Sequence, residues 1–495
     1  MLYMMKEEMS INRNNLFNVW LALTLSVLFF HPLFATLHDN VIILQWRIQN
    51  SLELLATLAL CTLLLTGALW LIDKATNIKI RLVLLILLFI VPFVSFFVHF
   101  MQQLGFKGNL ITLGQSVHQN RLFVVTIGLF CGSLFFLLVA RYPRRITHAL
   151  IVILLTLSPL NALAGWTLWN LRDKDTKIMI KSHALYEKKT MPPKHNLIVF
   201  LFDELSFEYL YKDGSINPLY VNFRRLSSIS DNYHAANSPG GKTITAIPGM
   251  LMGRRYKNIV MKYDKMQMVA KDNKEENLKI ESDNLFAVAK ANGYKTFAYG
   301  SYLPYCEMFD RSLDVCRSFS LYNYATAETQ FSLLNPIMTT FMIWPQQKPQ
   351  GLIKNKIASQ YQRRQIEQVF QITLTTLDEK EPIFLFSHID IPHFPFVFNR
   401  HGYYKNSTAF LQNDENYQKQ LEYVDYLLGE LLRRMMRNEV FESSNIIVLA
   451  DHNYRAMFPS SRNHIPLIFK KPYQQTKRDI FDPVNAENIL RKSLM

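Results

Sequence analysis

Charged side chains are scarce in the first 170 residues of this 495-residue chain. Five long apolar runs there contain a single formally charged residue, Glu53, at the edge of the second run. Ionisable residues usually line the substrate paths of transporters, so their scarcity disfavours that class. Buried helices of a soluble protein also fit poorly, because each run has the roughly 20 residues that cross a bilayer. The predicted spans cover residues 16–37, 52–72, 82–101, 122–140 and 146–169.

Two further features are missing. The first run lacks a small-residue cleavage site and is too long for the apolar core of a signal peptide, so we expect no cleavage there. No basic–aromatic array of a nucleic-acid module accompanies the net charge of +15, so the expected partner is the lipid bilayer and not nucleic acid. The segment Arg172–Lys189, which mixes lysines with Ile and Met, is either an interfacial helix or a solvated linker.

Positive charge in the connecting loops predicts the orientation, because short loops rich in Lys and Arg stay in the cytoplasm. Two loops carry this charge: Lys74, Lys79 and Arg81 follow the second span, and Arg141, Arg144 and Arg145 follow the fourth. The N-terminus is therefore predicted to be cytoplasmic. We expect a transmembrane domain (1–170), an interfacial linker (171–195) and an extracytoplasmic domain (196–495).

Cysteine is rare, with four residues in the whole chain. Cys61 and Cys131 lie in predicted spans, whereas Cys306 and Cys316 stand ten residues apart in the part predicted to face an oxidising compartment. Neither of the second pair has a CxxC partner or a closely spaced His, which disfavours a metal site there. We predict a disulfide between Cys306 and Cys316.

From Asn196 onward, short apolar or β-branched runs alternate with amphipathic stretches. The runs are LIVFLF (197–202), KTFAYG (295–300), PIFLFSHI (382–389) and NIIVLA (445–450), and a helical pattern covers 415–437. This alternation predicts an α/β domain with a mainly parallel sheet and helices on both faces. Ligands of such sheets bind beyond the carboxyl ends of the strands, so the residues that follow each run are site candidates.

Asp203 and Glu204 directly follow the first of these runs, and Asp451 and His452 directly follow the last. Each alone has an ordinary explanation, since an Asp after a strand is often a helix cap. Together, carboxylates and an imidazole at converging strand ends can form a divalent-metal site. The mixed oxygen and nitrogen donors favour Zn or Mn over Ca.

The segment SPGGKTITAIPGMLMG (238–253) places Lys242 and Thr243 after two glycines and before an apolar run. A Thr in the first turn of a helix can point its hydroxyl into the same crevice, where a metal would lower the hydroxyl's pKa and make it nucleophilic. The helix N-terminus and Lys242 would favour an anionic group beside it. The stretch lacks the GxxxxGK[ST] spacing of a nucleotide-binding loop, and a plain N-cap is the alternative explanation.

Three histidines complete the set of candidates. His388 and His393 lie in HIDIPHFPF (388–396), and His464 precedes the apolar run IPLIF. Imidazoles at these positions could contact a phosphate oxygen or protonate a leaving alcohol, and a structural role fits the sequence equally well.

Taken in order, four elements resemble the motifs of the alkaline phosphatase superfamily: Asp203 after a strand, Thr243 within GKTITAIPGM, the HxxxxHFP segment and the ADH triplet at 450–452. More specifically, they resemble its sulfatase-like membrane branch. That branch includes the lipid A phosphoethanolamine transferases and the lipoteichoic acid synthases, which similarly join five spans to an extracytoplasmic catalytic domain. The resemblance implies an enzyme of the bacterial inner membrane.

The resemblance also implies roles for most of the candidate residues. The metal ligands would be Asp203, Thr243, Asp451, His452 and, as a further acid, Glu204. Thr243 would also be the nucleophile, and His388, His393 and His464 would be substrate-side histidines. Lys242 joins the catalytic candidates through its place at the helix N-terminus, not through the resemblance. True sulfatases carry a CxPxR motif, whereas the corresponding stretch here begins at Thr243 and reads TITAI, which disfavours sulfate-ester hydrolysis.

The leading hypothesis from the sequence is a metal-dependent transferase. It would move a phosphoethanolamine-like head group from a phospholipid donor to an extracytoplasmic glycan or lipid A acceptor, through a phospho-threonine at Thr243. One alternative is a membrane-anchored sulfatase-like hydrolase or phosphodiesterase, which needs the same groups but uses water as the acceptor. The other is a non-catalytic membrane scaffold built on a degenerate enzyme fold.

Overall fold

The computed structural model describes residues 2–39, 41–74, 77–103, 141–172, 174–181, 193–262, 265–270, 275–277, 284–326, 330–343, 352–403, 413–458 and 460–494. Contacts between residues divide the chain into two units. The helical unit holds Met1–Val41, Trp46–Asp175 and Tyr322–Lys354, and the sheet unit holds Ile42–Gln45, Thr176–Leu321 and Asn355–Met495.

The helical unit is built from long apolar helices. They are α1 (Leu2–Asp39), α3 (Ile48–Asp73), α4 (Ile78–Gln103), α7 (Pro143–Leu157) and α8 (Pro159–Leu171). Among the described residues, four stretches are long and apolar enough to cross a membrane: Asn15–Leu37, Ile48–Asp73, Ile78–Phe97 and Pro143–Leu171. They correspond to the predicted spans 16–37, 52–72, 82–101 and 146–169, while the predicted span 122–140 lies outside the described residues.

The last of these stretches is divided at Ser158, where α7 ends and α8 begins with Pro159. Proline has no backbone N–H and its ring clashes with the carbonyl four residues back, so a helix restarts at a proline more easily than it continues through one. The helical unit also contains a returning segment from later in the chain, with a short 3-10 turn (Tyr324–Thr326) and α14 (Asn335–Ile343).

The sheet unit contains a ten-stranded sheet in the order β1-β10-β9-β11-β2-β14-β15-β5-β16, with β17 also paired to β5. The strands are β1 (Met179–Ile180), β2 (Leu197–Phe202), β5 (Asp231–Asn237), β9 (Lys295–Ser301), β10 (Val315–Phe319), β11 (Ile383–Ile389), β14 (Asn445–Ala450), β15 (His464–Lys470), β16 (Arg478–Ile480) and β17 (Val484–Asn485). The five strands from β10 to β14 run parallel, whereas β15 is antiparallel to both of its neighbours. The expected mainly parallel α/β sheet is therefore confirmed.

Three small sheets and several helices make up the rest of the described elements. Three small sheets comprise β3 (Tyr211–Lys212) with β4 (Ser215–Ile216), β6 (Tyr256–Lys262) with β7 (Lys265–Ala270) and β8 (Glu275–Asn277), and β12 (Phe398–Asn399) with β13 (Gly402–Tyr403). The helices are α2 (Val41–Leu44), α9 (Phe207–Leu210), α10 (Val221–Ser227), α11 (Thr243–Met252), α12 (Leu285–Ala291), α13 (Tyr305–Met308), α15 (Leu352–Thr376), α16 (Asp414–Arg437) and α17 (Ala486–Lys492), with a 3-10 turn at Asp310–Ser312.

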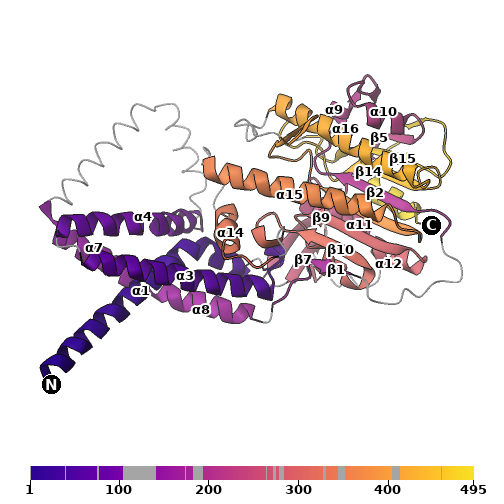
Figure 1. Cartoon of the computed structure of the whole chain (residues 1–495). Helices are drawn as coiled ribbons and strands as arrows, with labels where there is room; N and C mark the ends of the chain where they lie inside the picture. The colour runs from indigo at the N-terminus through magenta and orange to yellow at the C-terminus, as the bar shows by residue number, and fades with distance from the viewer. Residues whose placement is uncertain are drawn as a thin grey trace. The chain divides into compact units, whose positions relative to one another are not determined.

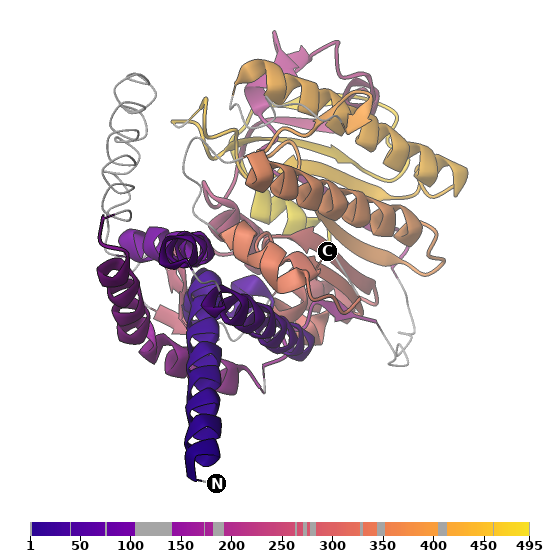
Figure 2. The same cartoon turned by 60° about the vertical axis from the view of Figure 1, so that its left-hand side comes forward.

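Helices cover both faces of the large sheet, as the side chains of β11 demonstrate. Successive strand residues point to opposite faces. The ring of Phe384 lies 5.2 Å from that of Phe286 on α12, while the hydroxyl of Ser387 lies 2.7 Å from that of Thr373 on α15. All residues of β2 and β11 are buried, which is typical of parallel strands covered on both sides. Figure 1 labels these helices, and the turned view in Figure 2 shows α15 and α16 side by side over one face.

The structure also bears on two predictions outside the site, the disulfide and the linker. The predicted Cys306–Cys316 disulfide is present and joins α13 to β10. The described part of the predicted linker contains β1, antiparallel to β10, at residues 179–180. Residues 182–192, where an interfacial helix was one of two interpretations, lie outside the described part of the chain.

Candidate metal centre and nucleophile

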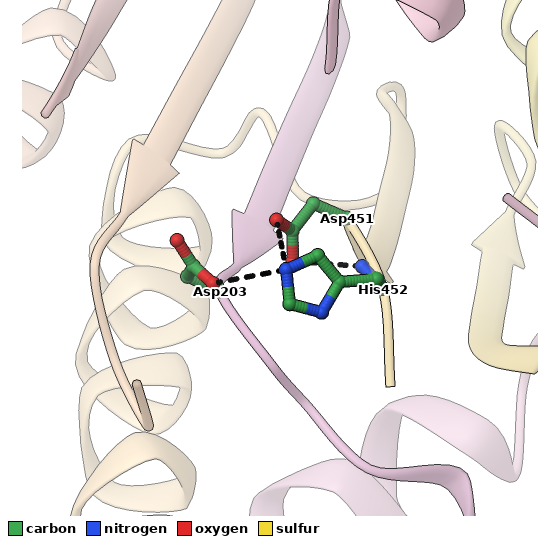
Figure 3. A group of neighbouring side chains, drawn as sticks. All are labelled: Asp203, Asp451 and His452. Carbon is green, nitrogen blue, oxygen red and sulfur yellow. Dashed lines mark hydrogen bonds and ion pairs between the residues drawn. The ribbon is translucent and has the colours of Figure 1, made fainter. Parts of the chain in front are cut away.

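Two neighbouring strands position the carboxylates of the site. Strands β2 and β14 are parallel, and their last residues, Phe202 and Ala450, are register partners. Asp203 and Asp451 are the next residues on each strand, so both carboxylates emerge at the same edge of the sheet. His452 follows directly, and Figure 3 shows one nitrogen of its ring joined by dashed lines to both carboxylates.

These three residues form a compact buried group. One possible ligand atom from each of Asp203, Asp451 and His452 lies within 4.8 Å of the others, and none of the three residues is more than 3% exposed. Nε2 of His452 is 3.2 Å from Oδ2 of Asp451 and 4.0 Å from Oδ1 of Asp203. Among the described residues, neither of those two carboxylate oxygens has a hydrogen-bond partner. Buried carboxylate oxygens without partners are costly, so this donor set fits a divalent cation.

The ring of His452 is oriented by the chain itself. Its Nδ1 lies 2.9 Å from the carbonyl oxygen of Asn453, which can only accept a hydrogen bond. Nδ1 must therefore carry the proton in the neutral ring, which leaves the lone pair of Nε2 directed at the carboxylates. Metal-ligating histidines are commonly fixed in this way by a backbone carbonyl.

Thr243 completes the group as the first residue of α11. Its Oγ1 is 3.4 Å from Oδ2 of Asp203 and 3.2 Å from Nε2 of His452, and the residue is 6% exposed. A threonine oxygen thus adds a fourth potential ligand, at a helix N-terminus that favours negative charge. Lys242, the N-cap residue of the same helix, has an exposed side chain.

The loop before α11 needs its two glycines because other groups pass very close to it. A Cβ atom on Gly240 would lie 2.4 Å from Oγ1 of Thr245, and one on Gly241 would lie 2.2 Å from Cδ of Arg462. Both distances are far shorter than a van der Waals contact. A side chain at position 240 would therefore press on the first turn of α11, whereas one at position 241 would press on the side chain of Arg462. The close approach at Gly240 thus helps to hold Thr243 against the carboxylates.

The three candidate histidines occupy different places. His388, on β11, is fully buried, with Nε2 3.2 Å from Oδ2 of Asp203 and Nδ1 2.8 Å from the hydroxyl of Tyr305. His393 has a side chain that is 24% exposed, and its Nδ1 is 3.8 Å from Oδ1 of Asp390. His464, by contrast, is the first residue of β15, and its Nε2 lies 2.8 Å from the carbonyl oxygen of His234 on β5. The structure thus brings His388 to the carboxylates, and the assigned role of His464 stays a prediction.

Glu204 lies beside the group but has its own partner. Its Oε1 accepts a hydrogen bond from Nε of Arg455 at 2.8 Å, and its backbone N–H donates to Oδ1 of Asp451 at 3.1 Å. The residue has a φ of 60°, in the left-handed region that non-glycine residues seldom occupy. This turn directs the side chain to Arg455, while the role of Glu204 as a metal ligand stays a prediction.

Charges around the site shift several pKa values. Burial alone would raise the pKa of Asp203, but His393 and His388 outweigh it and hold that pKa below its usual value. Burial and the charge of Asp203 raise the pKa of Asp451. Burial opposes protonation of His393, yet Glu204, Asp203 and Asp390 together raise its pKa to about 9. These carboxylates therefore favour the protonated form of His393.

Asp390 and Tyr305 are site residues that the sequence analysis missed. Asp390 is 2% exposed, its Oδ2 has no hydrogen-bond partner among the described residues, and burial raises its pKa to about 6. Its position at the end of the run PIFLFSHI was an available signal, because the same reasoning had selected Asp203 and Asp451. No sequence signal pointed to Tyr305, which reaches His388 from α13, 83 residues earlier.

The sheet edge that assembles two aspartates, a histidine and a threonine hydroxyl lies within the part of the chain that matches a sulfatase family model. The family model named Sulfatase matches residues 195–481, more than half of the chain, and the chain belongs to this family of enzymes. Sulfatase-family enzymes are metal-dependent, in agreement with the donor set. No curated protein matches the chain significantly.

Several solved structures resemble part of the chain at low sequence identity. One is a 2-O GAG sulfatase, at 11% identity over 60% of this chain and 68% of that chain, with a TM-score of 0.40. Another is the phosphonate monoester hydrolase of Agrobacterium radiobacter, at 12% identity, 60% and 72% coverage and a TM-score of 0.37. A third is a protein in the alkaline phosphatase superfamily from Vibrio parahaemolyticus, at 16% identity, 64% and 69% coverage and a TM-score of 0.38.

Proposed function

We propose that this membrane-associated enzyme transfers a phosphoethanolamine-like head group from a phospholipid to an extracytoplasmic glycan or lipid A. The observation that carries the proposal is the position of Thr243 Oγ1, within 3.4 Å of both Asp203 Oδ2 and His452 Nε2 at a helix N-terminus. A hydroxyl there is placed for nucleophilic attack on an anionic ester. A threonine at this position also supports phosphoryl transfer over sulfate-ester hydrolysis.

The metal would be Zn or Mn, held by Asp203, Asp451, His452 and Thr243. When bound, such an ion lowers the pKa of a coordinated hydroxyl and neutralises charge on the phosphate oxygens. The four donors comprise three oxygens and one nitrogen, a set that suits Zn or Mn better than the all-oxygen shells of Ca.

The protein groups divide the reaction between them. Oγ1 of Thr243, in its deprotonated form, attacks the phosphorus of the donor, and the bond from phosphorus to the diacylglycerol oxygen breaks. His393 donates a proton to that oxygen, a role that its pKa of about 9 and its partial exposure support. The acceptor hydroxyl then attacks the phospho-threonine, Thr243 leaves in the same deprotonated form, and the proton of the acceptor hydroxyl passes to His393. Lys242 and the N-terminus of α11 would stabilise the phosphate charge in both steps.

The apolar helices and the disulfide support the location that the reaction requires. Helices that can cross a membrane keep the enzyme beside its lipid donor. A disulfide is typical of an oxidising compartment, which supports a periplasmic or extracellular sheet unit and a cytoplasmic N-terminus.

Doubly labelled phosphatidylethanolamine tests the proposal, with ³²P in the phosphate and ¹⁴C in the ethanolamine. We expect both labels on Thr243 and then on an added glycan or lipid A acceptor. Both labels in free phosphoethanolamine would instead identify a phosphodiesterase. If neither label leaves the phospholipid and the protein binds no metal, the chain is a scaffold.

Three variants make the test specific. Thr243→Ala should lose activity about a thousandfold, whereas Thr243→Ser should keep part of it because the hydroxyl remains. The matched control is Thr245→Ala, since Thr245 is buried to a similar degree on the same helix turn and its hydroxyl bonds to the carbonyl of Lys242 instead. Equal losses for positions 243 and 245 would contradict the assignment of the nucleophile.

A further inference from the structure

Glu53 is the single charged residue in the predicted spans, and the proposed reaction does not use it. It lies on the second turn of α3, about 7.5 Å from the helix start, and is 1% exposed. Its neighbours Leu52 and Leu55 are 55% and 46% exposed, on the opposite side of the helix. Glu53 therefore points into the protein while the leucines beside it face outward.

Glu53 is bound by Gln49 and Asn50 of α3 itself and by groups from the returning segment, residues 322–326 and 330–343 of the helical unit. Oε1 of Glu53 accepts hydrogen bonds from the backbone N–H of Ser332 at 3.1 Å and from Nδ2 of Asn335 at 3.0 Å. The hydroxyl of Thr57, one turn further along α3, donates to the carbonyl of Leu333 at 2.9 Å. These three contacts, made by Ser332, Leu333 and Asn335, fasten the start of α14 to α3.

Further contacts extend this attachment on both sides. Nδ2 of Asn323 lies 3.3 Å from Oδ1 of Asn50 on α3, and the ring of Phe341 on α14 lies 6.0 Å from that of Phe29 on α1. Asn50, Asn323 and Asn335 are each at most 2% exposed. The polar groups of the segment are therefore satisfied inside the protein, as backbone and amide groups at membrane depth must be.

The outer surface of the same segment is apolar. Residues 330–343 contain no Asp, Glu, Lys, Arg or His, and Phe331, Leu333 and Leu334 are 54%, 36% and 58% exposed. The nine residues of α14 span only about 13.5 Å, too short to cross a bilayer core of roughly 30 Å. These exposed side chains flank Ser332, which bonds to Glu53 on α3, a helix long and apolar enough to cross a membrane.

We propose that Phe331, Leu333 and Leu334 form a lipid-contact surface that enters one leaflet of the bilayer, and that Glu53 holds this surface on α3. The occupant is the acyl chain of a phospholipid. The surface would anchor the start of α14 at membrane depth, independently of the reaction proposed above.

Photo-crosslinking of the full chain in vesicles of phosphatidylethanolamine and phosphatidylglycerol tests this surface. A benzophenone side chain is placed at position 331 or 334, and the vesicles contain a phospholipid with a tagged acyl chain. Position 63 is the positive control, because Leu63 is 70% exposed on the membrane-crossing α3, and position 219 is the negative control, because Leu219 is 63% exposed in the sheet unit.

We expect lipid labelling at positions 331 and 334 comparable to that at position 63 and at least about fivefold above that at position 219. Labelling at the level of position 219, or crosslinks to protein in place of lipid, would overturn the proposal.

A second measurement tests the role of Glu53. Glu53→Leu removes the acceptor and should reduce labelling at position 331 with no change at position 63, whereas Glu53→Gln keeps an acceptor oxygen and should retain most of it. Unchanged labelling at position 331 in a folded Glu53→Leu chain would refute the proposed attachment. If Glu53→Leu does not fold, Asn335→Ala, which removes one donor to Glu53, replaces it.

Discussion

Gly300 offers a sharp test of how the sheet positions the site. It lies on β9 as the register partner of His388 on β11. A Cβ atom at position 300 would lie 2.6 Å from Cε2 of Tyr305 and 2.9 Å from Cβ of His388, both too short to be tolerated without movement. Tyr305 and His388 are fully buried and hydrogen-bonded to each other, so Gly300→Ala must displace at least one of them.

The size of the effect follows from the contact that is lost. His388 reaches Asp203 through one hydrogen bond of 3.2 Å, which a shift of a few tenths of an ångström would take beyond hydrogen-bonding distance. A hydrogen bond to a charged group contributes about 1.5–3 kcal/mol, so kcat/KM should fall about 10- to 100-fold. Overpacking should also lower the free energy of unfolding by about 1–3 kcal/mol. Cleavage of labelled phosphatidylethanolamine and thermal unfolding measure the two quantities.

Two controls separate this mechanism from a general loss of stability. Gly67→Ala adds the same methyl group on α3 with no atom within 4 Å, so it should leave activity unchanged. In a double-mutant cycle, Gly300→Ala should cause little further loss when His388 is already Ala, because both changes remove the same contact. Wild-type activity of Gly300→Ala, or fully additive losses in the cycle, would refute the reasoning.

Three other predictions concern charge and covalent structure. Glu204→Gln should lower the pKa of His393 from about 9, because burial lowers this pKa and Glu204 makes the largest contribution that raises it. The alkaline limb of the kcat/KM profile should then move to lower pH. Asp231→Asn should destabilise the protein by about 2 kcal/mol at pH 7, because basic partners outweigh burial and lower the pKa of Asp231 to about 2. This stabilisation is complete above about pH 4 and is lost as the pH falls towards 2. The denaturation midpoints of the two forms should therefore converge at low pH. Replacing Cys306 and Cys316 by Ser should cost about 3 kcal/mol, judged from the ten-residue separation, and thermal unfolding in detergent would measure it.

Sequence patterns predicted the strands of the site well because those strands are fully buried. The runs 197–202 and 445–450 coincide with β2 and β14, and all six residues of β2 are buried. A continuous apolar run that ends at a carboxylate is a strong local signal, and parallel pairing then places Asp203 and Asp451 at one edge. The metal candidates therefore followed from local patterns alone.

Other parts of the site depend on contacts between distant segments, which a single sequence does not reveal. Tyr305 meets His388 because β9 and β11 are neighbours in the sheet, an order that the runs themselves do not specify. The pairing of Glu204 with Arg455 depends on a left-handed backbone at position 204. Residues 322–343 likewise join the helical unit through Glu53, although they lie in the middle of the sequence of the sheet unit.

The two aspartates of the site divide their oxygens in the same way. Oδ1 of Asp451 accepts from the backbone N–H groups of Glu204 and His452, and Oδ2 of Asp203 lies within 3.4 Å of both Thr243 and His388. One oxygen of each carboxylate is thus fixed by the protein, and the other, without a partner among the described residues, faces Nε2 of His452. Carboxylates that are already oriented need little rearrangement when a cation binds, since the cost of ordering them falls on folding and not on binding. This shared arrangement argues that the site is organised for a metal before the metal arrives.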